Sequence, residues 1–248
     1  MSKLFRSPLF YVGDKYKLIS EIKQHFPKSI SKFIEPFAGG GSVFMNVKAE
    51  KYILNDIDKN VVALHKFLIE QSKNSTLFFQ NIENKINEYD LSFSYKRNRI
   101  PVELKEKYKK TYFAKFNKEK FERLRKDYNS SQERDELILY LLLIYGFNRM
   151  LRFNSEGNFN LPVGNVDFNS NVVLALNQYF KLVSEKNIEW FNLDYKEFLS
   201  SLQITENDFV VIHLGGVIEK FLTKKDKTDV LKFLKDIKPN EMKMTFSA

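Results

Sequence analysis

Short apolar runs and amphipathic stretches alternate over the first seventy residues. Two runs, 32–35 and 51–54, have the length and composition of buried strands, while residues 16–26 and 59–71 carry apolar side chains at helical spacing. A glycine-rich loop and a helix-like run at 43–47 separate the two strands. This order of helix, strand, loop, helix, strand and helix predicts the start of a doubly wound α/β domain with a parallel sheet.

The middle of the chain has a different pattern. Residues 73–134 are polar, basic and helical in their spacing, and residues 135–145 are so uniformly apolar that they predict a core helix. Residues 146–169 are rich in turn-forming and aromatic residues, with 155–157 in the position of a hairpin turn. We therefore expect an insert of helices and a β-hairpin over residues 71–169.

The α/β pattern resumes after this insert. A helix is predicted over 172–185, strands over 188–191 and 209–212, and a short helix between the two strands. The chain then divides into a Rossmann-like α/β domain made of residues 1–70 and 170–248 and the insert between them. No tandem repeat is present in the sequence.

Composition removes several classes of protein. The 248 residues include no cysteine and three histidines. The absence of cysteine excludes disulfide scaffolds, zinc ribbons, thiol nucleophiles and iron–sulfur clusters. The small number of histidines disfavours a histidine-rich metal site. No run approaches the roughly 18 apolar residues of a membrane span, and the first residues lack the apolar segment of a signal peptide. We expect a cytoplasmic protein with neither a membrane partner nor a metal.

The net charge of +9 is concentrated in one stretch. Residues 96–134 hold 14 Lys or Arg and 6 Asp or Glu, a local excess of 8 positive charges. Aromatic residues are interleaved with these charges, and the spacing of Tyr112, Phe116, Leu124 and Tyr128 suits one helical face. The stretch is either a solvated amphipathic segment or a basic face over nucleic-acid phosphates.

A glycine loop follows the first predicted strand. The sequence Phe37-Ala-Gly-Gly-Gly-Ser42 lets the backbone approach a cofactor closely, and Asp56 ends the next strand 17 residues after Gly39. An acid in that position commonly binds ribose hydroxyls. The loop differs from the G-x-G-x-x-G of dinucleotide sites and from the P-loop, so a cofactor site and a tight packing turn both remain open from these residues alone.

Several segments together resemble the Dam-type, D12 class of DNA adenine-N6 methyltransferases, and above all its short bacteriophage members. Residues 11–15 are similar to the family's Y/W-x-G-x-K, and residues 33–42 to its F-x-E-P-F-x-G-G-G loop. Residues 54–57 match its N-D-x acid, and residues 145–164 look like its N-G-x-x-R-x-N-x-x-G-x-F-N-x-P-x-G segment. The four motifs stand in the family's order.

The resemblance implies a site for S-adenosylmethionine. Its members would be two residues near the start, the backbone of the glycine loop, the ribose-binding acid and an acid near the cofactor adenine: Tyr11, Lys15, Phe37, Gly39, Gly40, Gly41, Asp56 and Asp194. Without the resemblance, Lys15 reads as a surface lysine and Tyr11 as a packing ring.

The resemblance also implies that residues 146–164 are a hairpin that enters double-stranded DNA. Arg152 has the fork suited to guanine O6 and N7, and Phe147 is a candidate wedge that helps to extrude the target adenine. Asn148, Arg149 and Asn154 would be further base readers or phosphate ligands. The recognised site would be a short duplex sequence of the GATC kind. An ordinary surface hairpin is the alternative from the residues alone.

The family's catalytic Asp-Pro-Pro-Tyr is replaced in this chain. Aligned on the predicted strand, His213 stands where the Asp belongs, Leu214 and Gly215 replace the two prolines, and Gly216 replaces the Tyr. In the family, the Asp and a Pro carbonyl accept hydrogen bonds from the adenine amine, and the Tyr ring stacks on the flipped base. A neutral histidine lacks the anionic charge, and glycine has no ring to stack.

The sequence therefore supports three functions. The first is an adenine-N6 DNA methyltransferase, and the second is a catalytically inactive DNA-binding or cofactor-binding relative or subunit. The third is a methyltransferase for RNA or another amine that uses His213 as a base. Residues 243–248 resemble the family's next core strand, after which the sheet would be incomplete. Divergence, truncation or a sequence error would each produce the replaced motif and the incomplete sheet. The sequence leaves the oligomeric state open.

Overall fold

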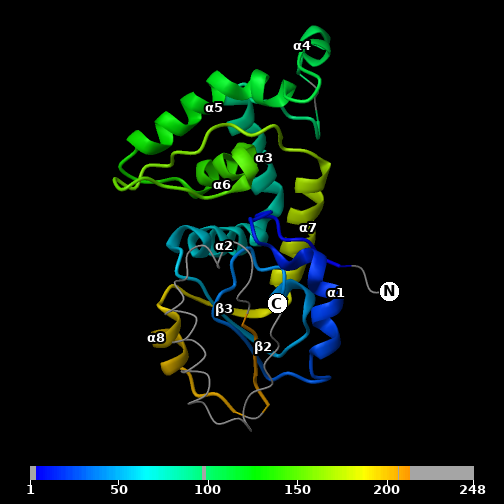
Figure 1. Ribbon diagram of the computed structural model, residues 1–248, viewed down its shortest axis with the longest axis vertical. Coiled ribbons are helices and arrows are strands. Elements are labelled where there is room, and N and C mark those ends of the chain that lie inside the picture. Colours follow the sequence, from blue (N-terminus) through cyan, green and yellow to red (C-terminus); the bar gives the residue numbers. More distant parts are fainter. Residues whose placement is uncertain (1–3, 97–98, 206, 213–248) are drawn as a thin grey trace. The chain divides into compact units, whose positions relative to one another are not determined.

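The computed structural model of the protein describes residues 4–96, 99–205 and 207–212 (Figure 1). The chain divides into two compact units. The first contains the described parts of Met1–Ser7, Gly13–Val62 and Leu182–Ala248, and the second contains Pro8–Val12 and Ala63–Lys181. The expected functional domain boundaries near residues 70 and 170 stay a prediction.

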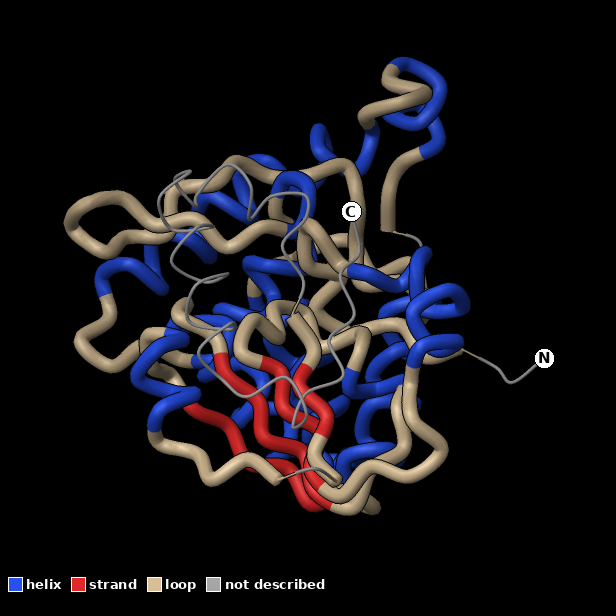
Figure 2. The backbone as a smooth tube through the Cα atoms, turned by 60° about the horizontal axis from the view of Figure 1, so that its bottom comes forward, coloured by secondary structure: helices blue, strands red, loops and turns tan. Residues whose placement is uncertain are grey.

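A parallel sheet forms the centre of the first unit (Figure 2). Its strands are β1 (Lys32–Glu35), β2 (Lys51–Asn55), β3 (Asn187–Phe191) and β4 (Phe209–Val210), in the order β3-β2-β1-β4. The chain order reverses at β1, and ligands of open α/β sheets bind beyond the carboxyl ends of the strands at such a reversal. The sheet confirms the predicted α/β class and marks the edge where a site is expected.

Alternation along the strands gives the sheet two buried faces. On one face, Ile34, Ile53 and Val210 pack against Phe198 and Leu199, two residues of helix α8 (Tyr195–Ser200). Each of these five side chains is at most 5% exposed. The short helix predicted between the last two strands is therefore present, and its two apolar residues cover this face.

The opposite face of the sheet is built mainly from aromatic rings. Phe33 lies 6.3 Å from Phe26 and 6.1 Å from Tyr52, measured between ring centroids. Phe44 lies 6.4 Å from Tyr52 and 6.0 Å from Trp190. Edge-to-face and tilted pairs of this kind add to the free energy gained by burial alone.

The two helices expected near the start of the chain are shorter than predicted. Residues 16–26 form a succession of a 3-10 turn η1 (Lys15–Leu18), one α-turn α1 (Ile19–Ile22) and a second 3-10 turn η2 (Lys23–His25). Residues 43–47 contain only the 3-10 turn η3 (Phe44–Asn46). The Asn46 side chain donates to the Ser42 and Phe5 carbonyl oxygens at 2.8 and 2.7 Å, and such local bonds compete with helix formation.

Helices make up most of the second unit. Their bounds are α2 (Lys59–Gln71, which begins in the first unit), η4 (Ser72–Asn74), α3 (Ser75–Glu88), α4 (Val102–Lys107), α5 (Tyr112–Ser130), α6 (Glu136–Tyr145), η5 (Phe147–Arg149) and α7 (Ser170–Ser184, which ends in the first unit). As predicted, α6 is a core helix, and Leu139 to Tyr145 are all buried. Asp135 caps it by accepting from the Leu137 and Ile138 amides.

We expect Asp208 to hold β4 against β1. Its buried carboxylate accepts from the Lys32 amide at 3.1 Å and the Thr205 amide at 2.8 Å, and pairs with the Lys32 ammonium at 3.1 Å. Asp208→Ala leaves these donors without their acceptor, so the free energy of unfolding should fall by about 3 kcal/mol. The exposed pair Lys51–Glu189 supplies the control. Glu189→Gln should cost less than about 1 kcal/mol in the same urea titration, and equal losses would contradict the assignment.

Candidate functional site

The glycine loop lies at the carboxyl end of β1 and is closed by a side chain from the end of β2. Gly39 and Gly41 have φ angles of 50° and 80°, a backbone region that glycine enters without strain. The Gly39 amide donates to the Asp56 carboxylate at 2.8 Å, and the Gly41 amide donates to the Ala38 carbonyl at 2.8 Å. The loop and the acid that were predicted to act together are therefore in direct contact.

Both carboxylate oxygen atoms of Asp56 accept hydrogen bonds from backbone amides. The second oxygen accepts from the Asp58 amide at 2.9 Å. Burial raises the pKa of Asp56 above its usual value, although the amide of Asp58 and that of Gly39 act in the opposite direction. The Ile57 amide also lowers this pKa by hydrogen bonding. Because a carboxylate offers about four acceptor positions, Asp56 can still accept from a ligand hydroxyl.

Asn55 connects the glycine loop to the end of β3. It is 1% exposed, and its side-chain amide donates to the Pro36 and Leu193 carbonyl oxygens, both at 3.0 Å. Its side-chain oxygen accepts from the Leu193 amide at 2.9 Å, and its backbone oxygen accepts from the Ala38 amide at 2.9 Å. One side chain thus fixes the spacing of three strand ends.

Two further carboxylates belong to this edge, and the sequence reasoning missed both. Glu35, the last residue of β1, is 1% exposed, and its pKa lies well above the usual value. Burial is the main cause of this rise, and the charges of Asp56 and Asp14 add to it. Burial also raises the pKa of Asp14, and the nearby Ser42 side chain of the loop acts in the opposite direction. A charged residue inside an apolar strand was the signal available for Glu35.

The other predicted cofactor residues of this unit lie in the glycine loop and at the starts of two short helical segments. The Phe37 ring centroid lies 5.4 Å from that of Tyr195. Asp194 caps α8 by accepting from the Lys196 amide at 2.9 Å. Lys15 begins η1, and Gly40 lies inside the loop. Tyr11 belongs to the second unit and is partly buried there.

The degenerate catalytic positions His213, Leu214, Gly215 and Gly216 lie outside the described residues. The described chain before them continues the sheet, since the Val211 amide donates to the Ile34 carbonyl at 2.9 Å. Ile212, its last described residue before this gap, is 3% exposed and belongs to the core.

The expected hairpin is present in the second unit. Two antiparallel bridges, Gly146 with Val163 and Phe153 with Phe159, join its strands. Its turn is closed by Asn154, whose amide donates to the Asn158 carbonyl and whose side chain accepts from the Asn158 and Glu156 amides at 2.8 and 3.1 Å. In this structure Asn154 therefore shapes the turn.

The five predicted DNA-contacting residues differ in what they touch. Phe147 is 50% exposed, Asn148 is exposed, and Asn148 and Arg149 have the left-handed φ angles of 53° and 49°. Such conformations outside glycine are costly and gather at functional sites. The Arg149 guanidinium lies 4.1 Å from the Phe10 ring centroid. Arg152 donates to the Asn160 side chain at 2.8 Å and to its carbonyl at 3.1 Å.

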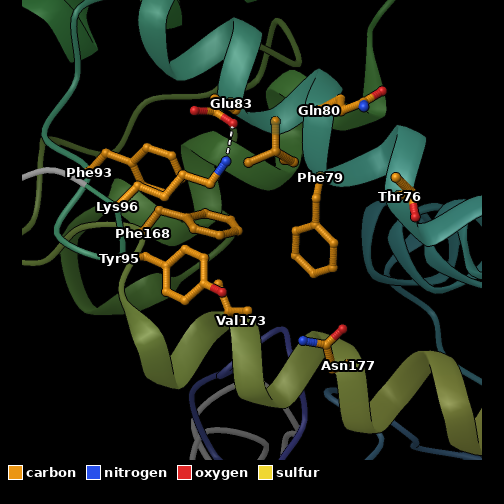
Figure 3. A pocket seen from close by; sticks show the side chains of 11 residues that line it. Thr76, Phe79, Gln80, Glu83, Phe93, Tyr95, Lys96, Phe168, Val173 and Asn177 are labelled. Carbon is orange, nitrogen blue, oxygen red and sulfur yellow. Dashed lines mark hydrogen bonds and ion pairs between the residues drawn. The ribbon is translucent and has the colours of Figure 1, made fainter.

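Part of the basic stretch is engaged within the unit. Lys96 pairs with Glu83 along one wall of a cavity of about 400 Å³ (Figure 3). This cavity lies between α3 and α7, is lined by rings that include Phe79 and Tyr95, and contains none of the predicted site residues. Asp90 pairs with Arg99 and Lys120. Besides the paired Lys96, the exposed lysines of the stretch are Lys107, Lys109, Lys110, Lys115, Lys118 and Lys126.

Helix α5 shows how the stretch is both basic and folded. Its buried positions are Asn117, Phe121, Leu124 and Tyr128. The last two were predicted to share a face, whereas Tyr112 and Phe116 are only partly buried. Asn117 donates to the Ser92 hydroxyl at 2.8 Å and accepts from the Ser92 amide at 2.8 Å, which accounts for a polar side chain in that row.

Comparison with known proteins decides the family. The sequence pattern of the D12 class N6 adenine-specific DNA methyltransferases matches residues 11–214. The chain belongs to this family. D12 class methyltransferases depend on S-adenosylmethionine and act on DNA, and the parallel sheet described above agrees with their Rossmann-like fold.

Three curated relatives illustrate the match. Modification methylase StsI of Streptococcus sanguinis is 32% identical over 212 residues, and type II methyltransferase M.FokI of Planomicrobium okeanokoites is 32% identical over 207 residues. These alignments cover 85% and 83% of this chain but 28% of each relative. The DNA adenine methylase of Escherichia coli K12 is 30% identical over 163 residues, 64% of this chain and 48% of that protein. The chain thus spans less than half the length of each.

The membership concerns residues on both units, because the match begins at Tyr11 and ends after the hairpin and β4. In the part of the chain that the structure describes, no helix is long and apolar enough to cross a membrane. The roles of individual site residues in this D12 family member remain predictions.

We expect Glu35 to make stability fall as the pH rises. Above its usual pKa of 4.5 the unfolded chain has lost the proton that the folded chain retains, so deprotonation favours unfolding until the pH passes the raised pKa. Glu35→Gln should therefore be more stable than the wild type near pH 7 and similar to it near pH 4, in urea titrations at both values. Glu21→Gln, an exposed change on α1, should show no such difference. A Glu35→Gln variant less stable than wild type at pH 7 would contradict the burial argument.

Proposed function

We propose that this chain binds S-adenosylmethionine at the carboxyl edge of β1 and β2 and acts as a DNA adenine-N6 methyltransferase. One observation carries the proposal: the Asp56 carboxylate closes the glycine loop at the strand reversal, beside the buried Glu35. Parallel α/β sheets bind ligands at this place. DNA as the substrate would place the activity in the cytoplasm of a bacterial or phage-infected cell.

The chemistry of this edge suits the proposed cofactor. S-adenosylmethionine supplies a methyl group on a positively charged sulfonium and carries an ammonium at its methionine end. Three carboxylates with raised pKa values, Asp14, Glu35 and Asp56, are groups that a bound cation would stabilise in their charged form. Perturbed carboxylates in one place also mark functional sites in general.

We assign the remaining cofactor contacts as follows. Asp56 accepts from the ribose hydroxyls, the backbone from Phe37 to Gly41 lies along the cofactor, and Asp194 lies near its adenine. Lys15 and Tyr11 help to hold the methionine end of the cofactor. Ile57, which is 69% exposed directly after Asp56, offers an apolar surface for the adenine ring.

We assign DNA binding to the hairpin and to the exposed lysines of the basic stretch. The half-exposed Phe147 is the candidate wedge, and it is followed by Asn148, the middle residue of η5. Arg152 can read a guanine after exchanging its contacts with Asn160. Three relatives are named as a modification methylase, a type II methyltransferase and a DNA adenine methylase, which supports a duplex site as the target. A GATC-like sequence is our proposed site.

An inactive relative is the second candidate, and the sequence His213 to Gly216 favours it. The exocyclic amine of adenine is a weak nucleophile because its lone pair is delocalised into the ring. Methyl transfer forms a bond from this nitrogen to the methyl carbon, breaks the sulfur–carbon bond and releases a proton. An anionic acceptor next to the amine assists this step, and a neutral histidine provides one acceptor without the charge. The chain would then bind cofactor and DNA without turnover.

Cofactor binding can be tested apart from catalysis. Asp56→Asn should weaken S-adenosylmethionine binding by roughly 10- to 100-fold in isothermal titration calorimetry, because a charge-assisted hydrogen bond is lost. Glu35→Gln should also bind more weakly although its apo protein is more stable at pH 7. Asp58→Asn removes the same charge two residues away and should bind within about threefold of the wild type. Equal affinities for Asp56→Asn and Asp58→Asn would refute the assigned site.

Replacement of His213-Leu-Gly-Gly216 by Asp-Pro-Pro-Tyr tests the catalytic assignment. Transfer of tritiated methyl to unmethylated GATC-containing duplex should rise by at least about 100-fold over the wild-type chain, since the anion and the stacking ring each contribute to the barrier. If the wild-type chain transfers no more methyl than the no-enzyme blank and the Asp-Pro-Pro-Tyr variant is active, the result supports the proposal that the chain is an inactive relative. A third candidate, RNA or another amine with His213 as base, requires wild-type activity that His213→Ala abolishes.

A further inference from the structure

The outer edge of the second hairpin strand is bonded to side chains rather than to another strand. Asn129 of α5 donates to the Phe159 carbonyl at 3.0 Å, and the Phe159 amide donates to the Asn129 side-chain oxygen at 2.8 Å. Arg125 donates to the Leu161 carbonyl at 2.9 Å, and Arg134 donates to the Gly157 carbonyl. Alternate backbone groups of residues 157–161 are thus held from one side.

The spacing of these contacts has a geometric reason. Four residues along a helix advance about 6 Å, and two residues along a strand advance about 6.6 Å. The step from Arg125 to Asn129 on α5 therefore matches the step from Leu161 back to Phe159 on the hairpin. The helix and the strand run in opposite directions, and Arg134, beyond the end of α5, continues the series to Gly157.

The hairpin needs this support. Within it, the backbone bonds near the tip are Asn154 to Asn158 at 2.9 Å, Gly157 to Asn154 at 2.9 Å and Asn160 to Arg152 at 3.0 Å. An isolated two-stranded hairpin is marginally stable in water, and an open strand edge leaves its polar groups to solvent or to other chains. The side chains from α5 and its C-terminal extension fill the place of a third strand.

We propose that Arg125, Asn129 and Arg134 are positioning residues that fix the register of the DNA-reading hairpin. The three are called the α5 clamp below. This inference rests on the proposed function, because it gives the clamp a role in sequence discrimination. It also divides the basic stretch, since Arg125 and Arg134 act on the hairpin backbone, whereas exposed lysines such as Lys126 act on DNA phosphates.

Two matched variants separate these roles. Arg125→Met and Lys126→Met each remove one positive charge from neighbouring positions of α5, but only Arg125 bonds the hairpin. A third variant, Asn129→Ala, removes two hydrogen bonds without changing the charge. Three measurements are made on the full chain: amide hydrogen exchange at Phe159, the sequence preference selected from duplexes with a randomised centre, and the salt dependence of binding to mixed-sequence DNA.

The clamp predicts opposite results for the two kinds of residue. Asn129→Ala and Arg125→Met should reduce the preference for selected over mixed-sequence DNA by about tenfold, with the salt slope unchanged. The Phe159 amide should exchange at least about tenfold faster in Asn129→Ala. Lys126→Met should retain the preference and the slow exchange while the salt slope falls by about 0.9, the value for one lost phosphate contact.

Two results would overturn the clamp: a salt slope that falls in Arg125→Met as it does in Lys126→Met, or unchanged preference and exchange in Asn129→Ala. If Asn129→Ala does not fold, Arg125→Met and its matched control decide the question. A wild-type chain that binds no duplex overturns the proposed function and the discriminating role together. Phe159 exchange still decides, without DNA, whether the clamp holds the hairpin.

Discussion

The hydrogen bond from the Gly39 amide to the Asp56 carboxylate joins the two strand ends on which the site depends. It turns the glycine loop back toward β2, while the neighbouring Asn55 side chain ties the same loop to the segment after β3. A parallel sheet delivers its carboxyl ends to one edge, but it does not fix the loops that leave them. Asn55 and Asp56 supply that constraint. Burying their amide and carboxylate groups lowers the free energy of unfolding in return.

The same edge shows a conflict between folding and binding. Glu35 lies in the core of the sheet with its pKa raised by burial and by two neighbouring carboxylates. Such a group destabilises the folded chain at neutral pH and becomes favourable only when a positive charge is brought to it. Stability given up in this way is typical of sites built for a charged ligand.

The sequence predicted those features that depend on short-range patterns. The strands at 32–35 and 51–54, the apolar helix before the hairpin and the hairpin turn itself follow from periodicity and turn chemistry. The helix expected at 43–47 was wrong because Asn46 bonds its own backbone surroundings and Phe5, a contact between residues 41 positions apart. Arg125 was beyond reach for a similar reason, because its role depends on partners that only the tertiary structure brings near. Glu35, by contrast, carried a signal in the sequence, since it is a charged residue inside an apolar strand.

The α5 clamp bonds carbonyl and amide groups of the hairpin and none of its side chains. Every residue except proline offers the same backbone groups at those positions. Asn158 and Asn160 lie between the bonded residues Gly157, Phe159 and Leu161. Substitutions at these two positions would therefore leave the hydrogen bonds from the α5 clamp intact. A scaffold of this kind would let the hairpin side chains that face a ligand vary while the backbone that carries them keeps its position.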